Sequence, residues 1–362
     1  MSATITNQYL PDSVPPPGES LHDTLEGLGM SQKDFAKRMG LSEKHISKII
    51  SGEVRITPET ALGFEKVLGV PARFWSNLEM NYQDHRARMR EAETLKEHLS
   101  WASNFPAVAM AKRKFIPETK AGLPRVRALL EFFGIAGVPE WEALWKKPEV
   151  AFRASAKRTA CPHALSAWLR AGERMAQQFS GPAYDVGTFQ SSLSSIRAAV
   201  ASPPENIETL LTEHCSRAGV ALHLVPELPK LAVCGACFWQ SNHPVILLNL
   251  YHNSEDHFWF NFFHEAKHVL QGLRKRLFVD VPGDAVEDEK EVEANAYAAD
   301  TLIPRRIWNS FCAKGDFSRQ AVTACAKTAS VPPGILVGQL QHHRLLDWAT
   351  PLNAMKRRFV WD

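Results

Sequence analysis

The chain has 362 residues, of which 45% are hydrophobic and 22% charged, and its formal net charge is +3. This length gives room for two or three domains with a sizeable core. The net charge is too small for the chain as a whole to attract nucleic acid, so nucleic-acid binding would need a local basic patch. The N-terminus lacks the basic start and apolar run of a signal peptide, and no apolar run of about 18 residues occurs, so we expect a cytoplasmic protein with no membrane partner.

The first segment of the chain is a leader followed by short helices. Residues 1–17 are polar and rich in proline, and we expect them to be disordered. Over residues 21–68, apolar residues recur at helical spacing between turn residues, which predicts a run of short helices. Ser31 and Ser42 are N-cap candidates, and the turn at residues 40–42 has the length that joins the two helices of a helix-turn-helix.

The second helix of this pair has the two faces that a recognition helix needs. Ile46, Ile49 and Ile50 face inward, while polar and basic side chains face outward. A solvated helical bundle with a basic face would show the same charges, but the length and order of the elements favour a DNA-binding unit. The predicted DNA contacts are Gln32, at a helix start, and Glu43, Lys44, His45, Ser47 and Lys48.

Two stretches carry a family resemblance. MSQKDFAKRMGLSEKHISKIISGE resembles the phage-repressor type of helix-turn-helix, and ITPETALGFEKVLGVPARFWSNLEMNY is similar to antidote repressors of toxin-antitoxin systems. The resemblance covers about residues 18–90, which we take as one domain. It implies a five-helix fold that binds operator DNA as a homodimer.

Residues 91–204 form the next segment. They are rich in tryptophan, alanine and arginine, and prolines punctuate their apolar runs, which predicts a helical middle domain. Its residues show no pattern of a catalytic site.

Beyond residue 206 the hydrophobic period changes from that of a helix to that of a strand. VALHLVPEL, LAVCGACFWQ and HPVILLNLY are rich in Val, Leu and aromatic residues and are bounded by turn residues, so they predict three strands. The second run holds Cys234 and Cys237; because no second pair completes a zinc site, we interpret them as buried strand or core cysteines. A predicted helix over residues 258–273 follows.

The stretch FFHEAKHVLQG in this helix holds two histidines four residues apart. On a helix His268 lies about 40° from His264, so both rings can bind one metal ion. An ordinary amphipathic helix can show the same spacing, but apolar residues gather on the opposite side of this one, which favours a chelating face. Glu265 is the candidate general base, which would take a proton from water and pass it to the leaving amine.

A third ligand is needed because a catalytic zinc ion binds three side chains and keeps a fourth position for water. The segment EKEVEANAYAADTLIP predicts a second helix, on which Glu291 shares an inward, apolar face with Val292 and Ala298. A buried carboxylate needs a cation, so Glu291 is the predicted zinc ligand, although Glu293 fits the local pattern almost as well. Asn295, one turn after Glu291, is predicted to support a ligand.

DHFWFNFFHEAKHVLQG and EKEVEANAYAADTLIP together resemble the ImmA/IrrE family of metallopeptidases, over about residues 205–310. The resemblance implies zinc dependence and cleavage of repressor proteins, which releases genes for stress response or mobile-element transfer. Family members often have glycine directly before the second histidine, where this chain has Lys267. Its ammonium, about 60° from the ligand face, either swings into solvent or opposes zinc binding.

The predicted fold class is α+β and mainly helical. It comprises an N-terminal helix-turn-helix bundle, a helical middle region, a zincin-like small sheet with its H-E-x-x-H helix, and a helical tail over residues 311–362. A strand near that helix, CGACFWQ or HPVILLNLY, is expected to bind an extended peptide by β-augmentation.

These features lead to one main hypothesis and two alternatives. The main one is a DNA-binding regulator with a zinc-dependent endopeptidase that cuts a regulatory protein, such as a repressor or a toxin-antitoxin component. The first alternative is a repressor or antitoxin whose peptidase fold is inactive and acts as a sensor or partner-binding domain. The second is a peptidase whose helix-turn-helix contacts only protein.

Overall fold

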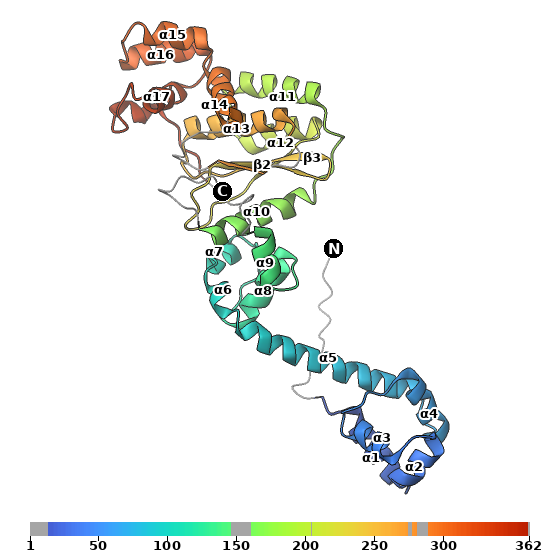
Figure 1. Cartoon of the computed structure of the whole chain (residues 1–362). Coiled ribbons are helices and arrows are strands. Elements are labelled where there is room, and N and C mark those ends of the chain that lie inside the picture. Colours follow the sequence, from blue (N-terminus) through green and yellow to red (C-terminus); the bar gives the residue numbers. More distant parts are fainter. Residues whose placement is uncertain (1–13, 146–160, 204, 274–276, 281–288, 361–362) are drawn as a thin grey trace. The chain divides into compact units, whose positions relative to one another are not determined.

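The computed structural model of the chain describes residues 14–145, 161–203, 205–273, 277–280 and 289–360 (Figure 1). Most of the predicted leader, residues 1–13, lies outside the described residues. The described part contains seventeen α-helices and one four-stranded sheet, which confirms the predicted α+β, mainly helical class. None of its helices combines the length and the hydropathy needed to cross a membrane. Contacts divide the chain into two compact units, residues 1–99 and 100–362.

The N-terminal unit is a bundle of short helices followed by a long one. Ser31 Oγ and Ser42 Oγ accept the backbone N–H of Asp34 and His45, each at 3.1 Å, so both are N-caps, as predicted. Gly40 ends the first helix of the pair at φ 65°, a left-handed conformation in which a side chain would be strained. The helices are α1 (Pro17–Gly27), α2 (Gln32–Met39), α3 (Glu43–Ile50), α4 (Pro58–Leu68) and α5 (Ala72–Lys96).

The core of this unit is apolar. Phe35, Ile46, Phe64 and Trp75 are 0% exposed, and the rings of Phe35 and Trp75 both pack on Phe64 with centroids 5.3 Å apart. Burial of a large apolar side chain contributes roughly 1.5–3 kcal/mol. The bundle is therefore held by its interior, and the outward side chains of α3 are not needed to stabilise it.

Seven helices of the described residues lie between α5 and the first strand in sequence. They are α6 (Leu99–Ser103), α7 (Ala107–Lys112), α8 (Leu123–Phe133), α9 (Val138–Trp145), α10 (Pro162–Ala176), α11 (Val186–Ala199) and α12 (Ile207–Arg217). Those up to α11 lie in the segment that was predicted to be helical.

The sheet has the order β1-β3-β2-β4. Its strands are β1 (Ala221–Leu224), β2 (Gly235–Gln240), β3 (His243–Leu248) and β4 (Phe278–Asp280). β1 is parallel to β3, while β2 is antiparallel to both β3 and β4. The three predicted strands correspond to β1, β2 and β3, and β4 was not predicted.

This order corrects one expectation about peptide binding. Strand β3, from HPVILLNLY, is paired on both sides, by β1 and by β2, so it has no edge to offer a peptide. In CGACFWQ, β4 already covers the second edge of β2 at Gly235–Cys237. Among the described strands, the outer edges of the sheet belong to β1, to β4 and to Phe238–Gln240 of β2, which β4 does not reach.

Helices cover both faces of the sheet. Figure 1 shows α12 and α13 (Glu255–Gln271) on one face and α10 on the other. Helix α10 is fixed there by Trp168, whose Nε1 donates to the carbonyl oxygen of Val225 at 3.0 Å. Gly172 of α10 lies against Leu247 of β3, where a Cβ atom would clash. The remaining helices are α14 (Glu289–Leu302), α15 (Arg305–Cys312), α16 (Arg319–Ala329), α17 (Pro333–His342) and the 3₁₀-helix η1 (Pro351–Met355).

Residues near the end of the chain bind the first turn of α13. Glu255 and Asp256 are buried, with exposed fractions of 0% and 6%. Arg357 Nε donates to Glu255 Oε2 at 2.7 Å, and Lys356 Nζ donates to Asp256 Oδ2 at 2.6 Å. Loss of one partner from a buried pair such as Lys356–Asp256 costs about 3–5 kcal/mol, whereas Arg357 is half-exposed. These contacts hold the segment after η1 against α13.

Candidate metal centre

Helix α13 carries the H-E-x-x-H stretch and begins at Glu255, three residues before its predicted start. It is among the most buried helices of the second unit, packed on β2 and β3 below and on α14 beside it. His264 and His268 are only 2% and 1% exposed. Two imidazoles buried this deeply need hydrogen-bond or metal partners.

Helix α14 supplies the partners. Ala294 and Ala298 are 0% exposed and form the face that packs on α13. Glu291 and Asn295 lie at the edge of that face and reach toward the histidines. Val292, which was predicted to point inward, is 53% exposed; that expectation is wrong because the packed stripe of α14 is narrower than the helical wheel suggested.

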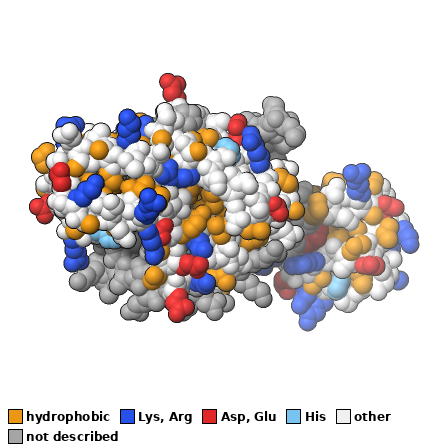
Figure 2. Space-filling model, turned by 90° about the horizontal axis from the view of Figure 1, so that it is seen from above, with side chains coloured by type: hydrophobic (Ala, Val, Ile, Leu, Met, Phe, Trp, Pro, Cys, Tyr) orange, Lys and Arg blue, Asp and Glu red, His pale blue; other side chains and the backbone are white. Residues whose placement is uncertain are grey.

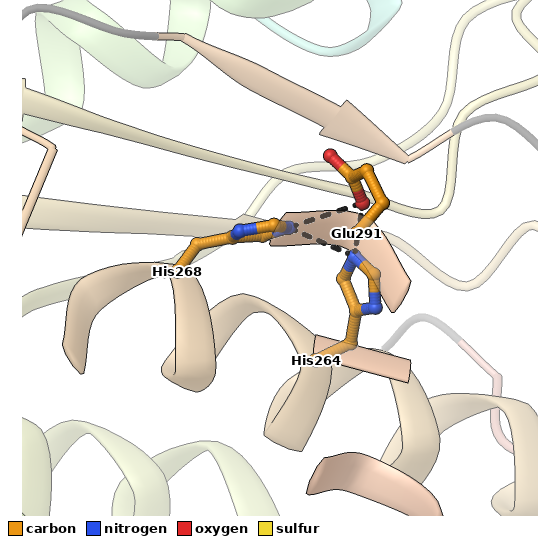
Figure 3. Close-up of side chains that lie close together, drawn as sticks. All are labelled: His264, His268 and Glu291. Carbon is orange, nitrogen blue, oxygen red and sulfur yellow. Dashed lines mark hydrogen bonds and ion pairs between the residues drawn. The ribbon is translucent and has the colours of Figure 1, made fainter. Parts of the chain in front are cut away.

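Three ligand atoms converge between the two helices (Figure 3). The Nε2 atoms of His264 and His268 are 3.0 Å apart. Glu291 Oε2 lies 3.2 Å from the first and 3.3 Å from the second. The structure thus brings the three predicted ligands together in a triangle with nearly equal sides.

The other ring nitrogens are held by amide oxygens. His264 Nδ1 is 2.9 Å from Asn295 Oδ1, and His268 Nδ1 is 3.0 Å from Gln271 Oε1. The orientation of the Gln271 amide is fixed because its Nε2 donates to the carbonyl oxygen of Lys290 and to Glu293 Oε2. An amide oxygen only accepts, so each Nδ1 carries the hydrogen and each Nε2 presents a lone pair.

The distances between the three ligand atoms show whether a metal ion fits between them. Two neutral imidazole nitrogens and a carboxylate oxygen point at one another, and acceptors this close need a shared cation. Ligand atoms about 2.0–2.1 Å from a tetrahedral zinc ion are about 3.3 Å from each other, close to the observed 3.0–3.3 Å. Two histidines and one glutamate are also a donor set of catalytic zinc sites. The residues therefore fit zinc.

Glu291 is ionised in this arrangement. Burial raises the pKa of Glu291, but when the rings of His264 and His268 carry a proton on Nε2, their hydrogen bonds and charges lower this pKa to about 2. An anionic oxygen at neutral pH is what a metal ligand requires.

Glu265 directly follows His264 in α13 and is 0% exposed. Its carboxylate rests on the backbone of Gly235 at the start of β2, where a Cβ atom would come within 2.6 Å of Oε1; only glycine leaves room for it there. Burial, followed by the charges of Glu265 and Glu291, raises the pKa of the Cys237 thiol well above its usual value. Cys237 therefore stays protonated and does not act as a thiolate ligand.

Lys267 and Glu293, the two uncertain residues of the motif, pair with each other. Lys267 Nζ lies 2.9 Å from Glu293 Oε1 and 5.4 Å from the centre of the Tyr297 ring. Hydrogen bonds from Lys267 and Lys290 lower the pKa of Glu293 to about 2. The ammonium thus points away from the ligand triangle, and Glu293 is engaged outside it.

Two residues at the site escaped the sequence analysis. Gln271 orients His268 as Asn295 orients His264, and its place one turn after His268 was an available signal. Phe278 of β4 stacks on the His268 ring, with centroids 3.9 Å apart and planes at 14°. No motif pointed to Phe278, because β4 is only three residues long.

The predicted DNA contacts lie in the other unit, on α2 and α3. Ile46 and Ile49 of α3 are buried, and the predicted contact residues lie on its outer side or at the start of α2. Lys48 also pairs with Glu53 at 3.7 Å on the surface. Glu43, Lys44 and Ser47 are exposed, whereas Gln32, His45 and Lys48 are half-buried.

Comparisons with known proteins match both units. The helix-turn-helix family matches residues 21–75, and a peptidase family described as the IrrE N-terminal-like domain matches residues 223–322. The uncharacterized HTH-type transcriptional regulator YddM of Escherichia coli (strain K12) is 31% identical over 65 residues, which are 18% of this chain and 69% of YddM. A solved addiction module antidote protein of a HigA family from Coxiella burnetii is 30% identical and has a TM-score of 0.22; the match covers 24% of this chain and 95% of that one. Both resemblances predicted from the sequence are confirmed.

Proposed function

We propose that this chain is a DNA-binding regulator that cuts a regulatory protein with the help of a zinc ion. The chain belongs to the helix-turn-helix transcriptional regulators through its N-terminal domain, and it carries an IrrE N-terminal-like peptidase domain. One observation carries the proposal: two histidine nitrogens and a glutamate oxygen converge within 3.3 Å of one another, with both histidines oriented by amide oxygens.

In the peptidase reaction, His264, His268 and Glu291 would hold the zinc ion. When bound, the ion would act as a Lewis acid and make a water molecule more acidic. Glu265 takes a proton from the attacking water on its carboxylate and returns it to the leaving amine. Asn295 and Gln271 keep both imidazoles in the tautomer that leaves Nε2 free to bind metal. The apolar packing beneath α13 keeps bulk water from the carboxylate of Glu265.

The DNA-binding part of the proposal rests on α3. Exposed Glu43, Lys44 and Ser47, with half-buried Gln32, His45 and Lys48, supply donors and acceptors for bases and phosphates. Their helix is anchored by buried isoleucines, as a recognition helix must be. We propose that the unit binds operator DNA as a homodimer, with its domain over about residues 18–90.

The substrate is a protein that acts on the same genes. A peptidase joined to a DNA-binding unit is held near regulators bound to that operator, which raises their local concentration. We therefore propose a repressor or a toxin-antitoxin component as the substrate. The peptidase domain spans about residues 205–310, between the helical middle domain over 91–204 and the helical tail over 311–362, in a cytoplasmic protein.

Elemental analysis tests the metal centre. We expect purified full-length chain to hold about one zinc ion, and His264→Ala combined with His268→Ala to remove it. A proton shared between the three acceptor atoms is the alternative to a zinc ion. A folded wild-type chain that takes up no zinc would mean that a proton joins the three side chains, and would favour an inactive domain that binds a partner.

A further inference from the structure

A groove of about 480 Å³ lies between α11, α13 and α14, which we call the α11–α14 groove. Figure 2 looks onto the face that carries α11 and α14, where hydrophobic side chains lie in a hollow among Lys and Arg side chains. This size and this mixture suit a small organic ligand. The groove is lined by Val186, Gln190, Leu193, Ser194 and Arg197 of α11, Lys267 and Leu270 of α13, and Tyr297 and Thr301 of α14.

The two cations of the lining differ in what they can bind. Arg197 donates to four backbone carbonyl oxygens, of Thr301, Leu302, Ala329 and Ser330, at 2.6–3.0 Å, so its donors serve the fold. Lys267 pairs instead with the carboxylate of Glu293, which is 44% exposed. The Lys267 side chain is 20% exposed. Because water reaches the Glu293 carboxylate and weakens its attraction to Lys267, an anion in the groove can take the place of Glu293 on Lys267.

Lys267 is connected to the metal centre by a chain of contacts. Its partner Glu293 accepts, through Oε2, a hydrogen bond from Gln271 Nε2 at 3.1 Å. Gln271 Oε1 lies 3.0 Å from His268 Nδ1. We call this chain, Lys267–Glu293–Gln271–His268, the groove relay. A larger groove of about 690 Å³ beside Phe115 and Phe132 is joined to the centre by none of the contacts described above.

We propose that the α11–α14 groove binds a small organic anion, a carboxylate or phosphate with an apolar part, and that the groove relay transmits its binding to His268. The anionic group pairs with Lys267, and the apolar part lies against Leu193 and Leu270. Glu293 then turns toward Lys290, which already lies 3.2 Å from its Oε2. Gln271 loses one of its two acceptors, and the hydrogen bond that orients His268 loosens.

In this proposal Lys267, which directly precedes the second histidine of the metal motif, binds the anionic group of the ligand. It also gives the regulator an input for a chemical signal, at a site half built by α11, outside the matched peptidase segment. Binding in the groove does not depend on the proposed function, but its effect on the centre rests on the proposed zinc ligands.

Calorimetric titration of the zinc-free, full-length chain tests the groove. The probes are octanoate, phenylacetate and phenyl phosphate, with 1-octanol as an uncharged control. We expect at least one anion to bind saturably and to bind at least about 10-fold more weakly to Lys267→Gln. Lys290→Gln is the matched control, because it removes another ammonium from Glu293 without altering the lining. Absence of binding by all three anions, or equal binding to Lys267→Gln, overturns the site.

Competition with a zinc chelator, with and without the bound probe, tests the relay. We expect the probe to change zinc affinity about 5-fold or more in the wild-type chain. Gln271→Leu should keep probe binding and lose this effect, because it breaks the relay outside the groove. Binding without any change in zinc affinity overturns the relay. A wild-type chain that binds no zinc contradicts the proposed metal centre instead, and the zinc-free titration still decides the groove.

Discussion

The two units of the chain place their functional residues in opposite surroundings. In α3 the predicted contacts lie on the outside of an apolar bundle, and none of them is buried. In α13 the histidines and Glu265 are at most 2% exposed and are surrounded by packed side chains. Residues on an exposed recognition surface can therefore be substituted without destabilising the fold. Buried polar residues of a site depend on the residues that hydrogen-bond and pack around them.

The largest test of this contrast is Glu265→Gln. Glutamine keeps the size of the side chain but cannot take the proton, so cleavage of the protein substrate should fall by about 10²–10⁴-fold while zinc stays bound. Rates of substrate cleavage and zinc content are measured on the same preparation, with exposed Glu289→Gln as the control for loss of a charge. Unchanged cleavage in Glu265→Gln would remove Glu265 from the reaction.

The next test separates two carboxylates that lie two residues apart. Glu291→Ala removes a ligand, so zinc affinity should fall by more than about 100-fold, beyond the usual effect of a supporting residue. Glu293→Ala removes a surface ion pair and should change zinc affinity by less than about 10-fold. Chelator competition measures both. The opposite order of effects would transfer the third ligand to Glu293.

Asn295→Ala sharpens the comparison within the buried site. The variant leaves all three ligands in place but removes the oxygen that holds His264 Nδ1, so we expect zinc affinity to fall about 10–100-fold. Asn295→Asp is the matched variant, because a carboxylate still accepts from Nδ1 and should retain most of the affinity. Equal losses in the two variants would mean that packing, and not the hydrogen bond, matters at this position.

The smallest effect is expected on the exposed side of the comparison. Lys44→Ala with Lys48→Ala removes two of the proposed phosphate contacts, so operator affinity should fall several-fold and the slope of log affinity against log salt should shrink by about 2. Zinc content and the melting temperature should stay at the wild-type values, since both side chains lie outside the core. Fluorescence anisotropy at several salt concentrations measures the slope; a slope equal to that of the wild type would exclude these lysines from the DNA contacts.

The sequence predicts features that depend on neighbouring residues better than features that depend on contacts between distant elements. The helix-turn-helix was accessible because capping serines, turn glycines and helical periodicity are local signals. The two histidines and Glu291 were also within reach, because helical spacing fixes which residues share a face. Gln271 needed the distance between α13 and α14, and the Lys267–Glu293 pair needed the direction in which two flexible side chains turn. Strand β4 was missed because three residues show no periodicity, and its place is set by pairing with β2.

The contacts between the chain's last residues and α13 also impose an order on biosynthesis. Residues 1–99 form a unit of their own, so the DNA-binding bundle can fold as soon as it leaves the ribosome. Helix α13 emerges later with two buried carboxylates whose counter-charges, Lys356 and Arg357, are not yet translated. At about 5–20 residues per second, these counter-charges follow Glu255 and Asp256 after roughly 5–20 s. The nascent chain is thus a DNA-binding protein before its peptidase unit is complete.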